Sequence, residues 1–159
     1  MKIRFATKED TPAILHLIKS IADYEKLLHE VTATEEIVFD SLFVKRAAEV
    51  LLGEEDDKII GFALFFHNFS TFTGKRGLYL EDLYVLPEYR GQGYGKQFFA
   101  ELMQIARERD CGRMEWICLD WNTPAIRFYK ENIGAIALND WTLYRLSEKA
   151  LQSAPFTFS

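Results

Sequence analysis

The sequence predicts a single α/β domain with a mixed, mostly antiparallel central sheet flanked by helices. Strand-like and helix-like segments follow one another in the order β-α-α-β-β-β-α-β-α-β, with no repeat and no linker between them. A loop with glycine at every second position joins the central strand to an amphipathic helix. The chain has 159 residues, of which 48% are hydrophobic, and this excludes disorder for the bulk of it and allows one substantial core.

The N-terminal elements follow from local patterns. Residues 2–6 are typical of a short strand. The run Asp-Thr-Pro at 10–12 begins a helix, because the missing N–H of proline costs nothing in a first turn. Apolar residues then keep a helical period at Ile14, Leu15, Leu17, Ile18, Ile21 and Ala22. The run Thr-x-x-Glu at 32–35 is a capping-box pattern, which predicts a second helix to about Val44.

Three strands are expected in the middle of the chain. Residues 49–53 and 58–66 read as strands joined by the acidic turn 54–57. Residues 67–77 read as a polar loop that contains glycine. The central strand, 78–85, is rich in branched and aromatic residues, as strands are.

The C-terminal elements return to the alternation. An amphipathic helix begins at Gln97, and its buried face is Phe98, Phe99, Leu102, Met103, Ile105 and Ala106. Residues 113–119 read as a strand, and Asn122 caps a helix that ends near Gly134. Residues 135–146 are expected to return as a final strand or hairpin.

The loop at 90–96, Arg-Gly-Gln-Gly-Tyr-Gly-Lys, carries the main functional signal. A helix start leaves about four N–H groups without partners, and glycines let a phosphate approach those donors. The spacing fits neither the P-loop nor the dinucleotide fingerprint. An ordinary turn with three glycines is the alternative. The strand before the loop, Arg90 and the helix after it favour a site for a phosphate-bearing ligand.

Composition and charge exclude several classes of protein. A net charge of −5 and the lack of long basic runs argue against nucleic acid as the main partner. We find no run of about 20 apolar residues and no signal peptide, so no membrane contact and a cytoplasmic location are expected. Cys111 and Cys118 read as reduced, packed thiols. The three histidines have no metal-like or triad-like setting, and no metal site is expected.

The run Val-x-Pro-x-Tyr-Arg-Gly-x-Gly-x-Gly at 85–95 resembles the acyl-CoA pyrophosphate loop of the GNAT superfamily of N-acetyltransferases. The element order matches the GNAT fold, with a domain at 1–147 and an unassigned tail at 148–159. Three runs narrow the resemblance to the spermidine/spermine N-acetyltransferase family: Tyr-Glu-Lys-Leu at 24–27, the run 79–95, and Asp-Trp-Asn-Thr-Pro-Ala-Ile-Arg-Phe-Tyr at 120–129. Glu-Lys-Leu, Ser-Thr-Phe at 70–72 and Leu-Asp-Trp-Asn at 119–122 resemble its thialysine branch most.

The resemblance implies acetyl-CoA as co-substrate and a small-molecule amine as acceptor. It implies that acetyl-CoA meets the strand end, the glycine loop and the last helix, at Leu83, Tyr84, Val85, Arg90, Gly91, Gln92, Gly93, Tyr94, Gly95, Lys96, Asn122, Pro124, Ala125 and Tyr129. It also implies a homodimer, in which the pair Asp140-Trp141 resembles one that some members present to the neighbouring subunit's site. A protein or peptide N-acetyltransferase and a non-catalytic acyl-CoA sensor remain the alternatives.

The reaction requires a proton acceptor. An alkylammonium has a pKa near 10.4, so reaching the free amine at pH 7 costs about 4.6 kcal/mol. Glu81, on the central strand, is the expected acceptor; capping a strand end or pairing with arginine is its alternative role. Asp82 is equally acidic, but neighbouring side chains of a regular strand face opposite sides, so both line one pocket only if the strand has a bulge.

The departing thiolate requires a proton donor. Tyr129 is expected to supply it, since a phenol with a pKa of about 10 can protonate a thiolate of about 8.5. Without the family match, a tyrosine beside Phe128 reads as core. Tyr24 and Glu25 match positions that line the amine channel, and an acid beside an aromatic face suits an ammonium; a solvated helix end is the alternative. Polyamine-specific relatives carry an acid and a tryptophan where this chain has 70–72, which weakens the case for a long polycation.

Overall fold

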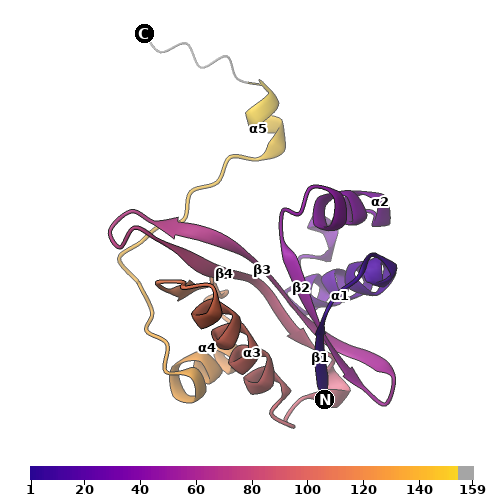
Figure 1. Ribbon diagram of the computed structural model, residues 1–159. Coiled ribbons are helices and arrows are strands. Elements are labelled where there is room, and N and C mark those ends of the chain that lie inside the picture. The colour runs from indigo at the N-terminus through magenta and orange to yellow at the C-terminus, as the bar shows by residue number, and fades with distance from the viewer. Residues whose placement is uncertain (154–159) are drawn as a thin grey trace.

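A computed structural model describes residues 1–153, and in this range one sheet has helices on both faces (Figure 1). The strand order is β1-β2-β3-β4-β5, in which the first four strands pair antiparallel and β5 lies parallel to β4. The strands are β1 (Lys2–Phe5), β2 (Glu49–Glu55), β3 (Lys58–Ser70), β4 (Lys75–Val85) and β5 (Met114–Glu115). The predicted mixed, mostly antiparallel sheet is therefore confirmed.

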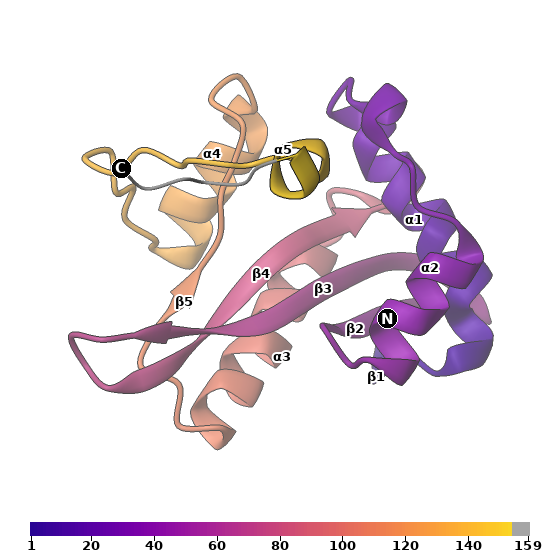
Figure 2. The same cartoon turned by 90° about the horizontal axis from the view of Figure 1, so that it is seen from above.

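The helices divide between the two faces of the sheet (Figure 2). The α-helices are α1 (Thr11–Tyr24), α2 (Glu35–Phe39), α3 (Tyr94–Glu108), α4 (Thr123–Arg127) and α5 (Glu148–Ser153). Helices α2 and α4 continue as π-helical turns at Asp40–Val44 and Phe128–Ile133, and short 3-10 turns lie at Lys8–Asp10, Leu28–Glu30 and Pro87–Tyr89. Helices α1 and α2 cover one face, and α3 and the turn after α4 cover the other.

Alternation along the strands builds two cores from one sheet. Leu52 and Phe62, fully buried, face α1, whereas their neighbours Leu51 and Ala63 face α3. Burying a large apolar side chain contributes roughly 1.5–3 kcal/mol, so each face fixes its helices mainly through such contacts. The sheet therefore forms the middle layer, with one helical layer packed on each of its faces.

A β-bulge in β4 inverts this alternation just before the functional site. Phe65 pairs with Leu80 and Leu64 pairs with Asp82, so Glu81 is the extra residue. Leu80 packs in the α3 core, and without a bulge Asp82 would face that side too. Instead Asp82 shares the face of its partner Leu64, which packs partly against the α1 core. Bulges re-aim side chains in this way and are frequent beside active sites.

Two predicted boundaries in the middle of the sheet differ from the observed ones. The polar loop predicted at 67–77 is instead a hairpin, in which β3 and β4 pair as far as Ser70 and Lys75. The polar side chains in that stretch find partners within the fold: Asn68 donates to Glu115 at 2.9 Å, and a ring nitrogen of His67 lies 2.9 Å from the carbonyl of Gly77. Their polarity therefore does not mark a loop. The acidic turn shrinks to Asp56 and Asp57, whose φ angles of 48° and 60° suit a two-residue hairpin turn.

Two helix starts also differ from the prediction. Thr34 rather than Thr32 caps α2, because its side chain accepts a hydrogen bond from the N–H of Ile37 at 3.3 Å. Helix α3 begins at Tyr94, three residues before the predicted Gln97. Its first turn thus includes the last glycine of the loop, which the apolar pattern alone could not show.

The predicted C-terminal strands are mostly absent from the described part of the chain. The strand expected at 113–119 is reduced to the two residues of β5. The expected final strand or hairpin at 135–146 forms no strand; it is extended, with a turn in which the N–H of Trp141 meets the carbonyl of Leu138 at 3.5 Å. Figure 1 shows α5 standing apart from the sheet at the end of this segment. Part of the predicted tail, 154–159, lies outside the described residues.

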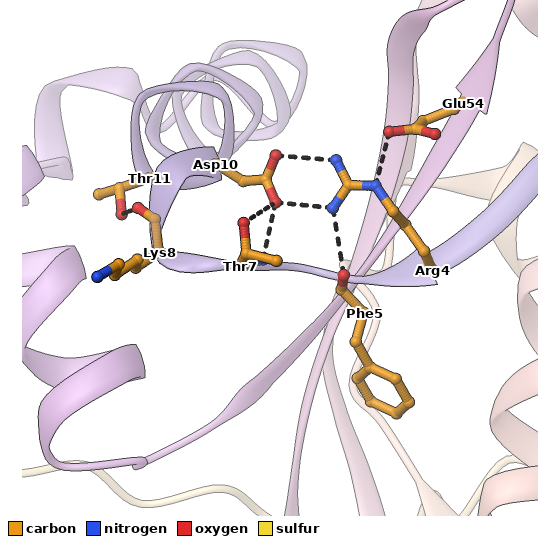
Figure 3. A network of polar contacts seen from close by, with 7 residues as sticks. All are labelled: Arg4, Phe5, Thr7, Lys8, Asp10, Thr11 and Glu54. Atoms are coloured by element: carbon orange, nitrogen blue, oxygen red, sulfur yellow. Dashed lines mark hydrogen bonds and ion pairs between the residues drawn. The ribbon is translucent and has the colours of Figure 1, made fainter.

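A polar network fixes the approach of α1 to the sheet (Figure 3). The Arg4 guanidinium on β1 donates to both carboxylate oxygens of Asp10 at 2.7 and 2.9 Å, and to Glu54 on β2 at 2.7 Å. Asp10 also accepts from the N–H of Thr7 at 2.7 Å. The hydrogen bond from Arg4 lowers the pKa of Asp10 to about 2. Helix α1 is therefore anchored at the end opposite to its contribution to the site.

Candidate active site

A cavity of about 590 Å³ lies where the C-terminal end of α1, the bulged end of β4, the start of α3 and the start of α4 converge. Glu81 and Asp82 both line it. The sequence predicted that both side chains could line one pocket only if the strand had a bulge, and the bulge is present. Because of it, Asp82 faces the α1 side of the sheet.

The glycine loop forms one end of the cavity. Gly91 and Gly93 have φ angles of 76° and 81°, in the left-handed region that favours glycine. A Cβ built on either residue meets no atom within 4 Å, so the cradle is open on that side. The first intrahelical bond of α3 runs from the N–H of Gln97 to the carbonyl of Gly93, and the preceding N–H groups have no acceptor within the helix. Open glycines and free donors at a helix start fit a phosphate group.

The edge of β4 that faces β5 is open beyond the bulge. The two strands pair only at Leu78 with Met114 and at Tyr79 with Glu115. Further along β4, Leu83 and Val85 line the cavity instead of continuing the ladder. Backbone groups at such a splayed edge can bond to an extended ligand arm, and these two residues are among those that the family resemblance implies meet acetyl-CoA.

Arg90 spans the two ends of the cavity. Its guanidinium carbon lies 4.8 Å from the ring centroid of Tyr24 and 5.1 Å from that of Tyr84. Its Nε donates to the carbonyl of Val85 at 2.9 Å. The sequence predicted Arg90 as part of the phosphate loop, whereas its side chain here contacts the aromatic wall.

Tyr129 lies on the π-helical turn after α4 and lines the cavity. Its ring packs edge-on against Trp116 and Phe99, with centroids 5.2 and 5.9 Å apart. Burial, and then the negative charges nearby, raise the pKa of Tyr129 above its usual value of 10.0. The phenol therefore keeps its proton at neutral pH and is available as a proton donor. It is a packed aromatic and a cavity residue at the same time.

Asn122 ties α4 to α1 across the cavity. Its side-chain oxygen accepts from the N–H of Ala125 at 3.4 Å, which confirms the predicted helix cap. The same oxygen accepts from the hydroxyl of Tyr24 at 3.2 Å. Tyr24 in turn contacts Tyr84 and Trp121 with ring centroids 6.4 and 6.2 Å apart. This end of the cavity thus has an aromatic wall held by a buried polar contact.

Three carboxylates make the end beside Tyr24 acidic. Burial, then the charges of Glu81 and Glu25, raise the pKa of Asp82 to about 7. Burial also raises the pKa of Glu25. Carboxylates that share a partly buried site repel one another, and a cation bound among them relieves that repulsion. The arrangement suits an alkylammonium next to aromatic faces.

The cavity brings together almost every residue that the sequence singled out. All of the predicted cofactor and substrate residues line it except Gln92, whose side chain instead accepts from the hydroxyl of Tyr94 at 3.1 Å. The cavity residues that sequence reasoning missed are Ile21, Tyr89, Ile117, Cys118, Phe128 and Asn132. Helical spacing could have found Ile21 and Asn132, which lie three residues from Tyr24 and Tyr129.

Within residues 1–153, no group of three or more metal-ligating side chains is placed to hold an ion, and no helix is long and apolar enough to cross a bilayer. A glycine-lined helix start, an acidic end with an aromatic wall and a tyrosine that keeps its proton line one cavity, and this combination suits a group-transfer enzyme.

The family described as Acetyltransferase (GNAT) family matches residues 13–135, and the chain belongs to it. The predicted family is therefore confirmed.

The relatives agree with this assignment. The chain is 34% identical to a thialysine N-epsilon-acetyltransferase from Bos taurus, with 94% of each chain covered. It is 32% identical to the L-ornithine N5-acetyltransferase NATA1 from Arabidopsis thaliana, over 96% of this chain and 86% of the relative. A solved integron cassette protein from V. cholerae superposes with a TM-score of 0.79 at 26% identity, covering 95% of this chain and 94% of the other.

Proposed function

We propose that the protein transfers the acetyl group of acetyl-CoA to the terminal amine of a small molecule by direct attack, with both substrates bound together. The observation that carries this proposal is a single cavity that has the glycine cradle at one end, carboxylates at the other and Tyr129 on its wall. Family membership supports the acetyl donor, and the acidic end supports an amine acceptor.

The proton of the ammonium goes to a carboxylate. Glu81 is the proposed acceptor, and Asp82 holds the ammonium beside it, since both side chains reach the cavity from the bulge. The free amine then attacks the thioester carbonyl, the new C–N bond forms and the C–S bond breaks. The thiolate leaves with a proton from the Tyr129 hydroxyl, which the raised pKa keeps protonated until that step. The nitrogen of the new amide passes its second proton to the resulting Tyr129 oxygen anion, and the carboxylate releases its own proton to solvent. Backbone groups of Leu83 and Val85 are proposed to align the acyl arm.

The proposed acceptors are thialysine-like or lysine-like amines and short diamines. The relatives named for thialysine and ornithine support this class. From the sequence, the missing acid and tryptophan at 70–72 counted as evidence against a long polycation. In the structure this segment lies at the turn of the β3–β4 hairpin and contributes no residue to the cavity. A missing acid at 70–72 therefore does not act on this cavity within one subunit, and the proposed preference rests on the three carboxylates that line it.

A homodimer is proposed as well. The segment 135–147 supports it, because Ile136, Trp141 and Tyr144 expose 83%, 75% and 89% of their surfaces. Exposed apolar side chains gathered in one segment are typical of an interface. Sedimentation of the full chain tests this, with Ile136→Ser combined with Tyr144→Ser as the variant expected to shift the protein to a monomer.

The test of the proposed activity is a screen of amines for CoA release, with the acetylated product identified by mass spectrometry. Thialysine, lysine, ornithine, putrescine, spermidine and spermine are compared at one ionic strength. Amine-dependent CoA release and an N-acetyl product are expected. Release without any amine dependence, or acetyl-CoA binding without turnover, would contradict the proposal and favour the sensor alternative.

A further inference from the structure

A second cavity, of about 500 Å³, lies beside the end of β1 and the start of β2. It shares no lining residue with the cavity of the candidate active site. Figure 2 shows α2 next to this end of the sheet and α4 on the opposite side of the molecule. Apart from one arginine and one glutamate the lining is apolar, and it consists of Phe5, Ala6, Leu42, Phe43, Arg46, Ala48, Glu49 and Val50. The volume is in the range of small-molecule sites, so the chemistry of this lining decides what the cavity can hold.

The apolar part of the lining comes from a strand and from a helical turn. Phe5, on β1, exposes 46% of its surface. Leu42 and Phe43 belong to the π-helical turn Asp40–Val44 that follows α2. Such turns are rare and are frequent at functional sites, and the other one within residues 1–153 carries Tyr129. The two rings thus offer a surface against which a flat apolar group can pack.

The charged part of the lining has a surplus of positive charge. Arg46 is exposed, and it forms no ion pair within residues 1–153. The acid of the lining, Glu49, is already engaged, because Arg109 donates to its two carboxylate oxygens at 2.5 and 2.9 Å. Since the charges of Glu49 and Arg109 offset each other, the charge of Arg46 is available to an anionic ligand.

A free stretch of strand edge lies beside Arg46. The N–H of Ala6 donates to the carbonyl of Val50 at 2.8 Å, at the point where the chain after β1 leaves β2. Ala48, two residues before Val50, continues the same edge, because alternate residues of a strand bond to the same side. The N–H and C=O groups of Ala48 have no backbone partner within residues 1–153. A guanidinium and a backbone N–H are the donors that carboxylates bind most often, and here they come from the same short segment.

We propose that this cavity is a second ligand site, which binds a small carboxylate with an aromatic or branched apolar body. Arg46 and the N–H of Ala48 hold the carboxylate, and the apolar body packs against Phe5 and Phe43. An amine of the same shape is excluded, because Arg46 repels it. The site is independent of the proposed acetyl transfer, since no residue of the candidate active site takes part in it.

Titration of the isotope-labelled full chain with phenylacetate, followed by NMR, tests this proposal. Phenylacetamide has nearly the same shape without the charge, and it serves as the matched probe. Phenylacetate is expected to bind with a dissociation constant on the order of 1 mM, as befits so small a ligand, and to shift the amide signals of Arg46, Ala48 and Val50. It is expected to bind about fivefold more tightly than the amide, which is the effect of a charge contact near solvent. Added CoA should leave these shifts in place, because CoA is proposed to occupy the other cavity.

Variants separate the role of the charge from that of the rings. Arg46 has a φ of 53°, a region that glycine enters without steric cost, so Arg46→Gly removes the cation and keeps the fold. It is expected to weaken phenylacetate about fivefold and to leave phenylacetamide unchanged. Phe5→Ala is expected to weaken both probes equally, with a thermal melt as the control for folding. Lys26→Gly removes a cation from another exposed left-handed position, with a φ of 62°, that does not line this cavity, and it is expected to change neither affinity.

Four results would overturn the proposal: no binding of phenylacetate, equal affinities for the two probes, an unchanged affinity for phenylacetate in Arg46→Gly, or shifts confined to the loop at 90–96. None of them bears on acetyl transfer, which the screen of amines tests separately.

Discussion

The two ends of the cavity are built in different ways. The end proposed to hold phosphate comes from one continuous stretch of chain, 90–96, and it offers backbone N–H groups and glycine surfaces. The amine end comes from side chains on α1, β4 and the start of α4, which lie far apart in the sequence. A ligand at the first end meets local backbone geometry, whereas a ligand at the second meets charges that only the tertiary fold brings together.

This difference predicts which binding properties should tolerate single substitutions. Backbone donors survive most side-chain substitutions, so affinity for acetyl-CoA should be lost only when a glycine is replaced or α3 is displaced. Preference among amines depends on a few carboxylates and rings, so single substitutions should retune it. Tyr129 stands between the two ends and should affect chemistry without affecting either binding step.

The largest expected effect is at Tyr129. Tyr129→Phe keeps the ring that packs on Trp116 and Phe99 but removes the proton donor. We expect kcat to fall by roughly 10²–10⁴ with little change in acetyl-CoA affinity. Steady-state kinetics and calorimetric titration measure the two quantities separately. A variant that keeps more than half of wild-type turnover would return Tyr129 to a purely structural role.

Gly93→Val tests the phosphate end. A branched side chain would project into the open cradle, and its left-handed backbone would add strain of about 1–2 kcal/mol at the start of α3. We expect acetyl-CoA binding to be abolished while the fold survives, since that strain is below a typical total stability. Calorimetric titration measures the binding, and a thermal melt provides the control for folding. Unchanged affinity would contradict the assignment of the glycine loop.

Asp82 should give the activity a dependence on pH. Because its pKa is about 7, Asp82 gains a proton as the pH falls through 7 and loses its attraction for the ammonium. The wild-type kcat/KM should therefore fall below pH 7, and Asp82→Asn should lack this limb and lose about 10- to 100-fold at pH 8. Glu81→Gln should move the limb to lower pH, because the charge of Glu81 contributes to the raised pKa. An unshifted, parallel profile in Glu81→Gln would contradict the charge coupling between Glu81 and Asp82 and would leave Glu81 no part in the pH dependence.

The same residue gives a prediction for stability. The pKa of Asp82 is higher in the folded protein than its ordinary 3.8, so the folded state retains a proton that the unfolded chain has lost between about pH 4 and 7. Ionised Asp82 therefore destabilises the fold, by about 2–4 kcal/mol once the pH exceeds 7. Asp82→Asn should be more stable than wild type at pH 8, with a gain that shrinks toward pH 4. Denaturant unfolding at both pH values measures it, and a pH-independent difference would contradict the raised pKa.

The smallest expected effect is the preference among amines. Thialysine, lysine and short diamines should exceed spermine in kcat/KM by a graded, few-fold margin, because single charge contacts near solvent contribute only up to about 1 kcal/mol. Side-by-side kinetics at one ionic strength decide the order. A tenfold lead for spermine or spermidine would replace the thialysine-like assignment by a polyamine one.

The glycine loop and the start of α3 could be predicted from the sequence because they are local, and their phosphate-binding role stays a prediction. The glycine spacing, the strand before it and the caps of α1 and α4 all depend on neighbouring residues. The sequence also predicted that Glu81 and Asp82 would need a bulge to meet in one cavity, but it could not show the bulge, which depends on the pairing of β4 with β3. Cys118 was missed for the same reason, since it reaches the cavity only through the fold.

The errors of the sequence-based prediction lie where local pattern and tertiary context disagree. Polar residues at 67–77 indicated a loop, yet β3 and β4 pair through them as far as Ser70 and Lys75, and the polar side chains of His67 and Asn68 bond to partners within the fold. Apolar residues at 135–146 indicated a strand, yet the segment pairs with none of the five strands of the described sheet. An apolar or polar sequence pattern shows which residues could be buried. Whether they are buried depends on which other elements the fold packs against them.

The cavity is proposed to hold acetyl-CoA and the amine at the same time. Initial velocities measured while both substrates are varied test it most directly, with thialysine as the acceptor. Direct attack predicts double-reciprocal lines that intersect. Parallel lines would contradict the account, because they would indicate that acetyl-CoA leaves its acetyl group on the enzyme, with Cys118 as the nearest thiol in the cavity, before the amine binds.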